Sequence, residues 1–410
     1  RNVTGVQTCT LPICVLARVA AHAPLAPVDV PHREMAGRVL AADVVAPEDV
    51  PPFANSAVDG FALRSADAAA PGATLRVVRT IAAGDPPGGP IGAGEAARIM
   101  TGAPVPPGVD AVAMGEHARV EGERVVLERA AAAGDAVRLA GEDVRRGTVV
   151  FRAGDVLSAA GIGVLASVNA RAVRAYPRAR VALLSTGDEL VTDGGPLGPG
   201  QIRESNLTVL GELLRRDGCA VTDLGIVPDD EATLERTLRD AAEHHDAIVS
   251  SGGVSMGDFD VVKAVLSRVA RMDWMQMAIK PAKPFAFGEL DAGGRPVWVF
   301  GLPGNPVSSI ISYELLARPA LRALMGHDRD LVRPAIRAVV DAPLRRKADG
   351  KVHFMRVHGE FGPDGRLHVR DTGPQGSHQL AATALANGLA VVPDGAGIAA
   401  GAEVDVIPLG

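Results

Sequence analysis

The spacing of apolar residues changes about 180 residues into the chain. From 178 to 326, short apolar runs typical of buried strands alternate with segments in which leucines recur at helical spacing. The run "RVALLS" at 180–185 is one such strand, and Leu207, Leu210 and Leu214 in the next segment share one face of a helix. This alternation predicts a central three-layer α/β domain whose parallel sheet is covered by helices on both faces.

The remaining segments have patterns typical of β structure. Residues 51–142 hold short alternating runs between clusters of glycine and proline, which predicts a small β-rich domain. After a weak helical start, residues 15–50 are extended, as are residues 143–177 apart from a short apolar helix around 162–167. We expect these two segments to form an extended linker domain together. Residues 331–410 indicate a compact β-barrel or sandwich, and we expect a C-terminal β-barrel, so the predicted fold class is multidomain α/β and β.

The first 14 residues, "RNVTGVQTCTLPIC", differ from the chain that follows, which is rich in alanine, arginine and proline. We interpret residues 1–14 as a non-native or artefactual leader. A secretory signal peptide is the alternative, but Arg18 interrupts the apolar run, and Gln7 and Thr8 stand where that run should begin. No apolar run reaches the roughly 18 residues that a membrane span needs.

The composition is 47% hydrophobic and 22% charged, which is typical of a folded globular protein. The net charge of -6 argues against nucleic acid as the main partner. We interpret the short basic stretch "LRRKADGK" around Arg345 as a turn. Cys9, Cys14 and Cys219 offer no disulfide framework, so we expect a reducing compartment, the cytoplasm. Cys219 begins a predicted buried strand, which favours a core position over a nucleophilic one.

Polar residues gather where the strands of the predicted α/β domain end. In an open parallel sheet, ligands bind outside the carboxyl ends of the strands. Five segments of turn and polar residues fall at such ends, namely "STGDEL", "VPDD", "SSGGVSMGDFD", "IKPAKP" and "GLPGNPVSS". Any one of them alone is consistent with an ordinary strand-to-helix turn. All five at one edge of one sheet indicate a ligand site.

Acidic residues on three of these loops suggest a metal ion. Glu189, Asp229 and Asp260 are carboxylates on different loops, and their convergence suits a hard divalent cation such as Mg²⁺. The alternative is that each acid caps a helix, where Asp and Glu are favoured in any case. We assign Asp258 to such a cap.

Cations and glycines on the other loops suit an oxyanion. Lys280 and Lys283 are compact cations, and the paired glycines of "SSGGVS" let backbone N–H groups approach a ligand closely. Asn305 is placed as a helix N-cap with Pro306 in the first turn, so we expect free N–H groups to point at the sheet edge. The chain has neither a G-x-x-x-x-G-K-[ST] loop nor a G-x-G-x-x-G after the first strand, which disfavours an NTPase or a dehydrogenase.

Together these segments resemble the MoeA/gephyrin E-domain family of molybdopterin molybdenumtransferases. The matching stretches are "PPFANSAVDGFAL", "RIMTGAPVPPGVDAV", "LLSTGDELV", "SSGGVSMGDFD", "IKPAKPFAFG" and "GLPGNPVSS", in this order along the chain. The resemblance implies a four-domain subunit and the last step of molybdenum cofactor synthesis, in which molybdate enters adenylylated molybdopterin and AMP is released. It also implies a homodimer in which the β-rich domain of one subunit faces the α/β domain of the other. The upstream adenylyltransferase and molybdoenzyme targets are further candidate partners.

The resemblance implies roles for individual positions, which for the loop residues of the α/β domain agree with the residue chemistry given above. The catalytic set consists of Asp59, Glu189, Asp229, Asp260 and Lys280, and the expected Mg²⁺ ligands among them are Asp229, Asp260 and Glu189. The substrate-binding set consists of Thr101, Gly252, Gly253, Ser255, Lys283, Pro303, Asn305, Pro306, Ser308, Arg356 and Ser377. Of these, the resemblance implies molybdate or phosphate contacts for Ser255, Lys283, Arg356 and Ser377.

The chain departs from the family pattern at three places. Gln276 stands where the family usually has a basic residue, which we expect to weaken anion binding. Ala282 replaces the usual glycine between the two lysines and is expected to restrict that loop. The segment before about Val15 does not match the family.

Two alternative functions remain. The α/β segment alone resembles the adenylyltransferase that makes the adenylylated pterin, because both share the Gly-Gly and Gly-Asn-Pro loops. The chain also resembles gephyrin-type scaffolds, whose E-domains bind receptors at the dimer interface. Asp59 and the flanking domains favour molybdenum insertion, and the retained acids and lysines speak against a purely structural role.

Overall fold

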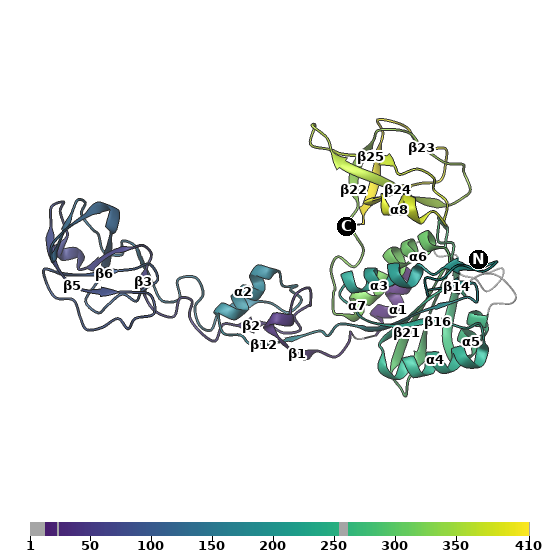
Figure 1. The fold of residues 1–410 in the computed structure, drawn as a ribbon, viewed down its shortest axis with the longest axis horizontal. Coiled ribbons are helices and arrows are strands. Elements are labelled where there is room, and N and C mark those ends of the chain that lie inside the picture. Colours follow the sequence, from purple (N-terminus) through teal and green to yellow (C-terminus); the bar gives the residue numbers. More distant parts are fainter. Residues whose placement is uncertain (1–12, 23, 254–260, 410) are drawn as a thin grey trace. The chain divides into compact units, whose positions relative to one another are not determined.

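The computed structural model describes residues 13–22, 24–253 and 261–409 (Figure 1). The chain divides into two compact units, one formed by residues 29–175 and the other by the rest of the chain. The first unit contains the β-rich and linker segments, and the second contains the α/β domain and the C-terminal barrel. No helix among the described residues combines the length and the apolar character that a membrane crossing requires.

The α/β domain is built on a sheet of six strands in the order β16–β13–β17–β21–β20–β18. The first four strands are parallel, as the sequence predicts. β20 is antiparallel to β21, and β18 is antiparallel to β20, so the sheet is mixed at one side. The connection between β20 and β21, residues 292–295, is too short for the crossover that a parallel pair needs. The strands are β13 (Arg180–Thr186), β16 (Ala220–Val227), β17 (Ala247–Ser251), β18 (Ala270–Gln276), β20 (Pro284–Asp291) and β21 (Pro296–Leu302).

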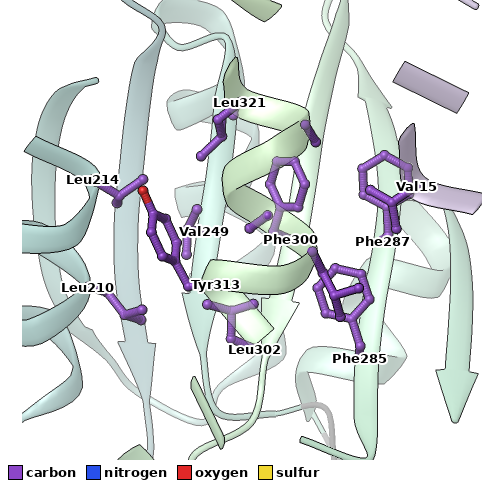
Figure 2. Close-up of a cluster of buried hydrophobic side chains, with 14 of the residues drawn as sticks. Val15, Leu210, Leu214, Val249, Phe285, Phe287, Phe300, Leu302, Tyr313 and Leu321 are labelled. Atoms are coloured by element: carbon purple, nitrogen blue, oxygen red, sulfur yellow. The ribbon is translucent and has the colours of Figure 1, made fainter. Parts of the chain in front are cut away.

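Helices cover both faces of this sheet, because side chains along each strand alternate between the faces. Val181 and Leu183 of β13 belong to the core beneath α1, α3, α6 and α7. Ala182 and Leu184 belong to the core beneath α4 and α5. Figure 2 shows part of the first core, in which Tyr313 lies among aliphatic and aromatic side chains. The helices are α1 (Ile13–Ala20), α3 (Asn206–Arg216), α4 (Glu231–His244), α5 (Val261–Val269), α6 (Pro306–Ser312) and α7 (Arg318–Leu324).

Helix α1 packs on the α/β domain, whereas the sequence pattern assigned residues 15–50 to the linker. Val15 and Val19 lie one turn apart and are buried in the same core as α7. This apolar face needs an apolar surface to cover it, and the α/β core provides one. Farther along, the backbone N–H of Leu25 donates to the carbonyl oxygen of Leu324 over 2.9 Å. The chain therefore leaves the α/β domain only after Leu25.

The C-terminal segment forms a closed β-barrel, as expected. Its strands follow the order β24–β25–β22–β28–β26, and β26 pairs back to β24. Val357, Val369 and Val406 fill the interior. A short strand from the α/β domain, β19, pairs in parallel with β24, so that Lys280 lies opposite His353. The strands are β19 (Ile279–Lys280), β22 (Ile336–Val340), β24 (Val352–Phe361), β25 (Leu367–Asp371), β26 (Gly388–Val392) and β28 (Glu403–Pro408).

The unit of residues 29–175 contains a six-stranded sheet and a smaller linker region. The sheet has the order β7–β4–β6–β5–β9–β8. The linker region pairs β1 (Val28–Pro31) with β12 (Ala172–Ala175) and β2 (Val44–Val45) with β11 (Val149–Phe151). The short helix expected there forms as α2 (Ala159–Ser167), with the side chain of Ser158 as its N-cap. The sheet strands are β4 (Gly60–Leu63), β5 (Thr74–Ile81), β6 (Glu95–Ile99), β7 (Ala111–Met114), β8 (Ala118–Glu121) and β9 (Arg124–Leu127).

Candidate functional site

The strand register brings the predicted loops to one edge of the α/β sheet. Thr186 at the end of β13 pairs with Val227 at the end of β16, and Ser251 at the end of β17 pairs with Leu302 at the end of β21. Because all four strands are parallel, their following loops start at the same level. On the mixed side, Gln276 at the end of β18 pairs with Pro284 at the start of β20. The loop that carries both lysines, residues 277–283, therefore joins the same edge.

The two glycine loops at this edge are in backbone contact. A Cβ atom built on Gly304 would lie 3.7 Å from the Cα atom of Gly252, so these two loops pack closely. The N–H of Gly252 donates to the carbonyl oxygen of Leu302 over 3.0 Å. Gly252 has φ +94°, and a Cβ atom there would lie 2.9 Å from the carbonyl oxygen of Thr186. Gly253 has φ +68° and leaves room for Val262. Both positions therefore need glycine.

Asn206, which the sequence analysis did not single out, joins these loops. It is buried at the first position of α3, and its Nδ2 atom donates to Ser251 Oγ over 2.8 Å and to the carbonyl oxygen of Gly304 over 2.7 Å. Its Oδ1 atom is buried and has no hydrogen-bond partner among the described residues. Asparagine before a leucine-rich helix looks like an ordinary helix start, so the sequence offered no signal of these distant partners.

Glu204 fixes the start of α3 beneath Asn206. Its Oε1 atom accepts hydrogen bonds from the N–H groups of Asn206 at 2.8 Å and Leu207 at 2.9 Å. The same atom accepts from Ser185 Oγ, at the end of β13, over 3.0 Å. A carboxylate at a helix N-terminus satisfies unpaired N–H groups and complements the helix dipole. Glu204 therefore links the start of α3 to the end of β13.

The predicted acids differ in their surroundings. Glu189 is exposed, and its Oε2 atom lies 2.6 Å from the position a Cβ atom would take on Gly187. Asp229 is exposed, and its backbone N–H faces Asp188 Oδ1 at 3.5 Å, so the two loops are neighbours. The cap of α4 is Asp230, whose carboxylate accepts from Thr233 N–H over 2.8 Å. Bonds to Thr233 are the main cause that lowers the pKa of Asp230.

Only part of the expected metal site lies within the described residues. Asp260, Asp258 and Ser255 lie outside the described residues. Among the residues that the structure does describe, no group of three or more His, Cys, Asp or Glu side chains is arranged to hold a metal ion. Glu189 and Asp229 thus provide two of the expected carboxylates, on adjoining loops.

The lysine loop presents both cations on the surface. Lys280 and Lys283 are exposed, and the carbonyl oxygen of Lys283 accepts from Met277 N–H over 2.7 Å. Between them, Ala282 is buried with φ +74°, a conformation that glycine adopts without strain and alanine does not. Ala282 thus has a left-handed backbone conformation, and its restriction of the loop stays a prediction.

The "GLPGNP" loop begins α6 as predicted, with Pro306 in the first turn and Asn305 at the N-cap. Asn305 is exposed and makes no side-chain cap bond, whereas Pro303 and Ser308 are buried. The prediction of free N–H groups is wrong for Val307, whose N–H donates to the carbonyl oxygen of Ser377 over 3.1 Å. The contact arises because the barrel loop that contains Ser377 lies against the start of α6.

Arg356 is fully buried in β24 and does not face an open surface. Its Nη2 atom donates to the carbonyl oxygens of Pro374 at 2.7 Å and Gly376 at 3.2 Å, and Gln375 Oε1 accepts from its backbone N–H at 2.9 Å. Burial lowers the pKa of Arg356. In this structure the guanidinium group therefore shapes the loop that precedes Ser377.

Two further predicted residues meet in the other unit. Asp59 Oδ1 accepts from both the backbone N–H and the hydroxyl of Thr101, each over 2.7 Å. These two bonds are the main causes that lower the pKa of Asp59, and the charge of Arg98 adds to them. Asp59 is thus an exposed carboxylate that stays ionised well below neutral pH.

Cys219 lies in the core, as the sequence predicts. It is 5% exposed, and burial raises the pKa of its thiol to about 12. A thiol with so high a pKa is not a nucleophile at neutral pH.

Comparison with known proteins gives three family matches that together span most of the chain. Residues 13–169 match the MoeA N-terminal region (domain I and II), and residues 182–323 match a probable molybdopterin binding domain. Residues 338–409 match the MoeA C-terminal region (domain IV).

Relatives with similar sequences and structures extend over nearly the whole chain. A molybdopterin molybdenumtransferase of Haemophilus influenzae is 38% identical over 378 residues, which cover 92% of each chain. Molybdopterin molybdenumtransferase 2 of Mycobacterium tuberculosis is 37% identical and covers 93% of this chain and 94% of the relative. A crystal structure of the molybdopterin biosynthesis MoeA protein from Pyrococcus horikoshii OT3 has a TM-score of 0.75 and 26% identity, and covers 98% of this chain and all of the other.

Proposed function

The chain belongs to the MoeA family of molybdopterin molybdenumtransferases, and on that premise we propose that it inserts molybdate into adenylylated molybdopterin and releases AMP. The observation that carries the proposal is the backbone contact between the loops of Gly252 and Gly304 at the carboxyl edge of the sheet. Carboxylates and lysines stand on the neighbouring loops of the same edge. This combination suits a substrate that has both oxyanion groups and a phosphoanhydride.

In this proposal, the protein acts mainly by positioning and by neutralising charge. Backbone N–H groups of the two glycine loops and the ammonium groups of Lys280 and Lys283 hold the pyrophosphate and molybdate side by side. Holding two reactants in contact lowers the barrier, and fixed positive charge stabilises the negative charge that develops. Asn206 and Glu204 keep the loops in this arrangement and touch neither reactant.

We further propose that Asp229 and Glu189, together with Asp260, hold a Mg²⁺ ion. Two exposed carboxylates on adjoining loops are hard oxygen ligands of the kind that this ion prefers. When bound, the ion would polarise the phosphoanhydride for release of AMP. The carboxylates would hold the ion by their negative charge.

Asp59 and Thr101 would contribute to the site only in a homodimer. We propose that they reach the α/β edge of the partner subunit, which is the arrangement that the family resemblance implies. Their own geometry supports a role in a polar site, because two hydrogen bonds from Thr101 lower the pKa of an exposed carboxylate. The proposed location is the cytoplasm, which agrees with a buried free thiol at Cys219.

The test is AMP release from adenylylated molybdopterin with molybdate, and with tungstate in a parallel arm. Asp229→Asn should lower the rate at least tenfold and raise the Mg²⁺ concentration needed for half of the maximal rate. Asp230→Asn is the matched control, because it removes a neighbouring carboxylate but keeps a good helix cap.

Three outcomes would contradict the proposal. An AMP release rate in Asp229→Asn equal to that of the wild type would contradict the assignment of Asp229 as a Mg²⁺ ligand. Consumption of ATP with molybdopterin in the absence of molybdate would favour an adenylyltransferase. A folded dimer that releases no AMP with any divalent cation would favour a scaffold.

A further inference from the structure

A cluster of largely buried charges lies at the end of α3 that is farther from the candidate site. It consists of three arginines and two carboxylates, and we call it the junction cluster: Arg216, Asp217, Glu314, Arg318 and Arg333. The side chain of Glu314 is 1% exposed, and those of Arg318 and Asp217 are 8% and 9% exposed. None of these five residues belongs to the candidate site or has a role in the mechanism proposed above.

Glu314 joins α3 to the segment that leads into the barrel. Its Oε1 atom accepts from Arg216 Nη2 over 2.6 Å, and its Oε2 atom accepts from Arg333 Nε over 2.8 Å. Arg216 is the last residue of α3, and Arg333 lies shortly before β22, where the barrel segment begins. Both oxygens of one buried carboxylate therefore connect the α/β domain with the barrel.

Asp217 joins α3 to α7 and to the π-helical turn Tyr313–Ala317. Its Oδ2 atom accepts from the hydroxyl of Tyr313 over 2.8 Å and from Arg216 over 2.9 Å, and its Oδ1 atom accepts from Arg318 Nε over 3.2 Å. In Figure 2 the hydroxyl of Tyr313 points towards α3. Burial alone would raise the pKa of Asp217, but the hydrogen bonds from Arg216 and Tyr313 outweigh burial and lower it. The carboxylate is thus ionised at neutral pH.

Two arginines of the junction cluster also hold the chain where it enters and leaves the barrel. Arg318 Nη1 donates to the carbonyl oxygen of Leu331 over 3.1 Å, and Arg216 Nη1 donates to that of Leu409 over 3.2 Å. Leu331 precedes β22, and Leu409 follows β28, the last strand of the barrel. The cluster therefore fixes both ends of the barrel to the α/β domain.

Stability alone does not explain why charged groups occupy this position. Taking charges out of water costs free energy, and apolar side chains of similar volume are often equally stabilising. Apolar contacts have little directionality, whereas the donors of a guanidinium group are fixed in one plane. The junction cluster therefore defines the orientation of the barrel more narrowly than an apolar contact would.

This orientation matters because the barrel reaches the edge of the candidate site at two points. The N–H of Val307, in the first turn of α6, donates to the carbonyl oxygen of Ser377 over 3.1 Å. The N–H of Val352, at the start of β24, donates to the carbonyl oxygen of Ala278 over 3.0 Å. Ala278 lies in the loop that carries both lysines, and Ser377 is one of the predicted substrate contacts.

We propose that Glu314 and Asp217 are positioning residues for the transferase reaction, which hold the barrel so that the loop of Ser377 lies against the start of α6. Both carboxylates lie at the ends of helices α3 and α6 that are opposite to the glycine loops, and they act through the arginines. The inference rests on the proposed function for its effect on substrate binding, but not for its effect on the orientation of the barrel.

The experiment compares Glu314→Gln with Asp246→Asn in the full chain. Each variant removes one buried carboxylate that pairs with two arginines, but the partners of Asp246, Arg180 and Arg295, both belong to the α/β domain. Circular dichroism melting confirms that each variant folds. Arg333→Gln, which removes a cation from the same cluster, takes the place of Glu314→Gln if that variant does not fold.

Hydrogen exchange followed by mass spectrometry measures the amides of Val307 and Val352, which bond across the domain junction, and those of β17 in the middle of the sheet. We expect the two junction amides to exchange at least tenfold faster in Glu314→Gln and within twofold of the wild type in Asp246→Asn. The amides of β17 should stay within twofold in Glu314→Gln. Unchanged exchange at the junction, or equal acceleration in β17, would overturn the inference, because Glu314 would then not orient the barrel or would only stabilise the fold.

Steady-state AMP release gives the second readout, at a temperature where all variants are folded. The KM for molybdate should rise at least fivefold in Glu314→Gln and stay within twofold in Asp246→Asn. Faster exchange at the junction with an unchanged KM would overturn the role in the reaction. A wild type that releases no AMP would contradict the proposed function, and the exchange experiment would still decide whether Glu314 orients the barrel.

Discussion

The side-chain Nδ2 atom of Asn206 donates to the carbonyl oxygen of Gly304 over 2.7 Å and also to Ser251 Oγ. One buried side chain thus connects the start of α3 with the ends of β17 and β21, the two strands that lead into the glycine loops. The spacing of those loops depends on a donor that comes from a third element.

Replacement of Asn206 by Asp keeps the shape of the side chain but removes the donor. The carboxylate would face the Gly304 carbonyl oxygen without a hydrogen between them, so we expect the unfolding free energy to fall by about 2 kcal/mol or more. Urea unfolding followed by fluorescence measures it, because both Trp274 and Trp298 lie in the α/β domain. The control is Asn305→Asp, at an exposed cap position, with an expected change within about 0.5 kcal/mol. Equal effects of the two variants would contradict the prediction.

Gly253 and Gly293 form a matched pair for testing the contact with Val262. Their φ angles are +68° and +66°, but a Cβ atom on Gly253 would lie 2.1 Å from Val262 Cγ2, whereas nothing lies within 4 Å of one on Gly293. Alanine at either site costs about 1 kcal/mol for the left-handed backbone. We expect Gly253→Ala to cost about 1–3 kcal/mol more than Gly293→Ala in urea unfolding. Similar costs at both positions would show that the loop relaxes away from Val262.

The hydroxyl of Thr101 can be removed without changing the shape of the side chain. Thr101→Val deletes one of the two hydrogen bonds to Asp59 Oδ1, so the pKa of Asp59 should rise towards its ordinary value. The carboxylate would then become protonated at a higher pH than in the wild type. Carbon-13 NMR titration of the carboxyl group measures this, and Thr101→Ser, which keeps the hydroxyl, should restore the low pKa. No change in the valine variant would assign the shift to the backbone N–H alone.

We expect His327 to make the stability of the α/β domain depend on pH. Burial, with Arg322 and Arg318 nearby, lowers its pKa from 6.5 to about 4, and its Nδ1 atom accepts from Arg322 over 3.2 Å. Because the folded pKa is depressed, this contribution to stability is complete above pH 6.5 and is lost as the pH falls towards 4. Between pH 7 and pH 5 the wild type should lose about 2 kcal/mol more unfolding free energy than His327→Gln.

The control for this prediction is His244→Gln, at an exposed position of α4. Its pH response in urea unfolding should equal that of the wild type. A His327→Gln variant with the wild-type pH response would show that folding does not lower the pKa of His327.

The sequence predicted the parts of the fold that depend on local periodicity. The leucines of α3 and the alternation of β13 each mark a buried face, and both faces are found in the structure. The pair β18 and β20 was not predicted, because "RMDWMQ" mixes charged and apolar residues on an edge strand. α1 was placed in the wrong region, because its apolar face does not say which core covers it.

The candidate site was predictable as a set of loops but not as a set of contacts. The parallel strands explain why the loops of Gly252 and Gly304 share an edge. Asn206 and its partners are 45 and 98 residues apart in sequence, and no local pattern reports such a bond. Arg356 was expected to contact molybdate or phosphate, and in the structure its guanidinium group donates to carbonyl oxygens of the loop that follows β25, about 18–20 residues farther along the chain.

The pairing of β19 with β24 has a consequence for the reach of Lys280. Although the lysine belongs by sequence to the α/β domain, its backbone is the edge strand of the barrel sheet. Any change in the tilt of the barrel would carry the ammonium group with it and alter its distance from the glycine loops. The electrostatic potential at the strand ends therefore depends on the orientation of the C-terminal barrel, although the hydrophobic core of the barrel lies outside the α/β domain.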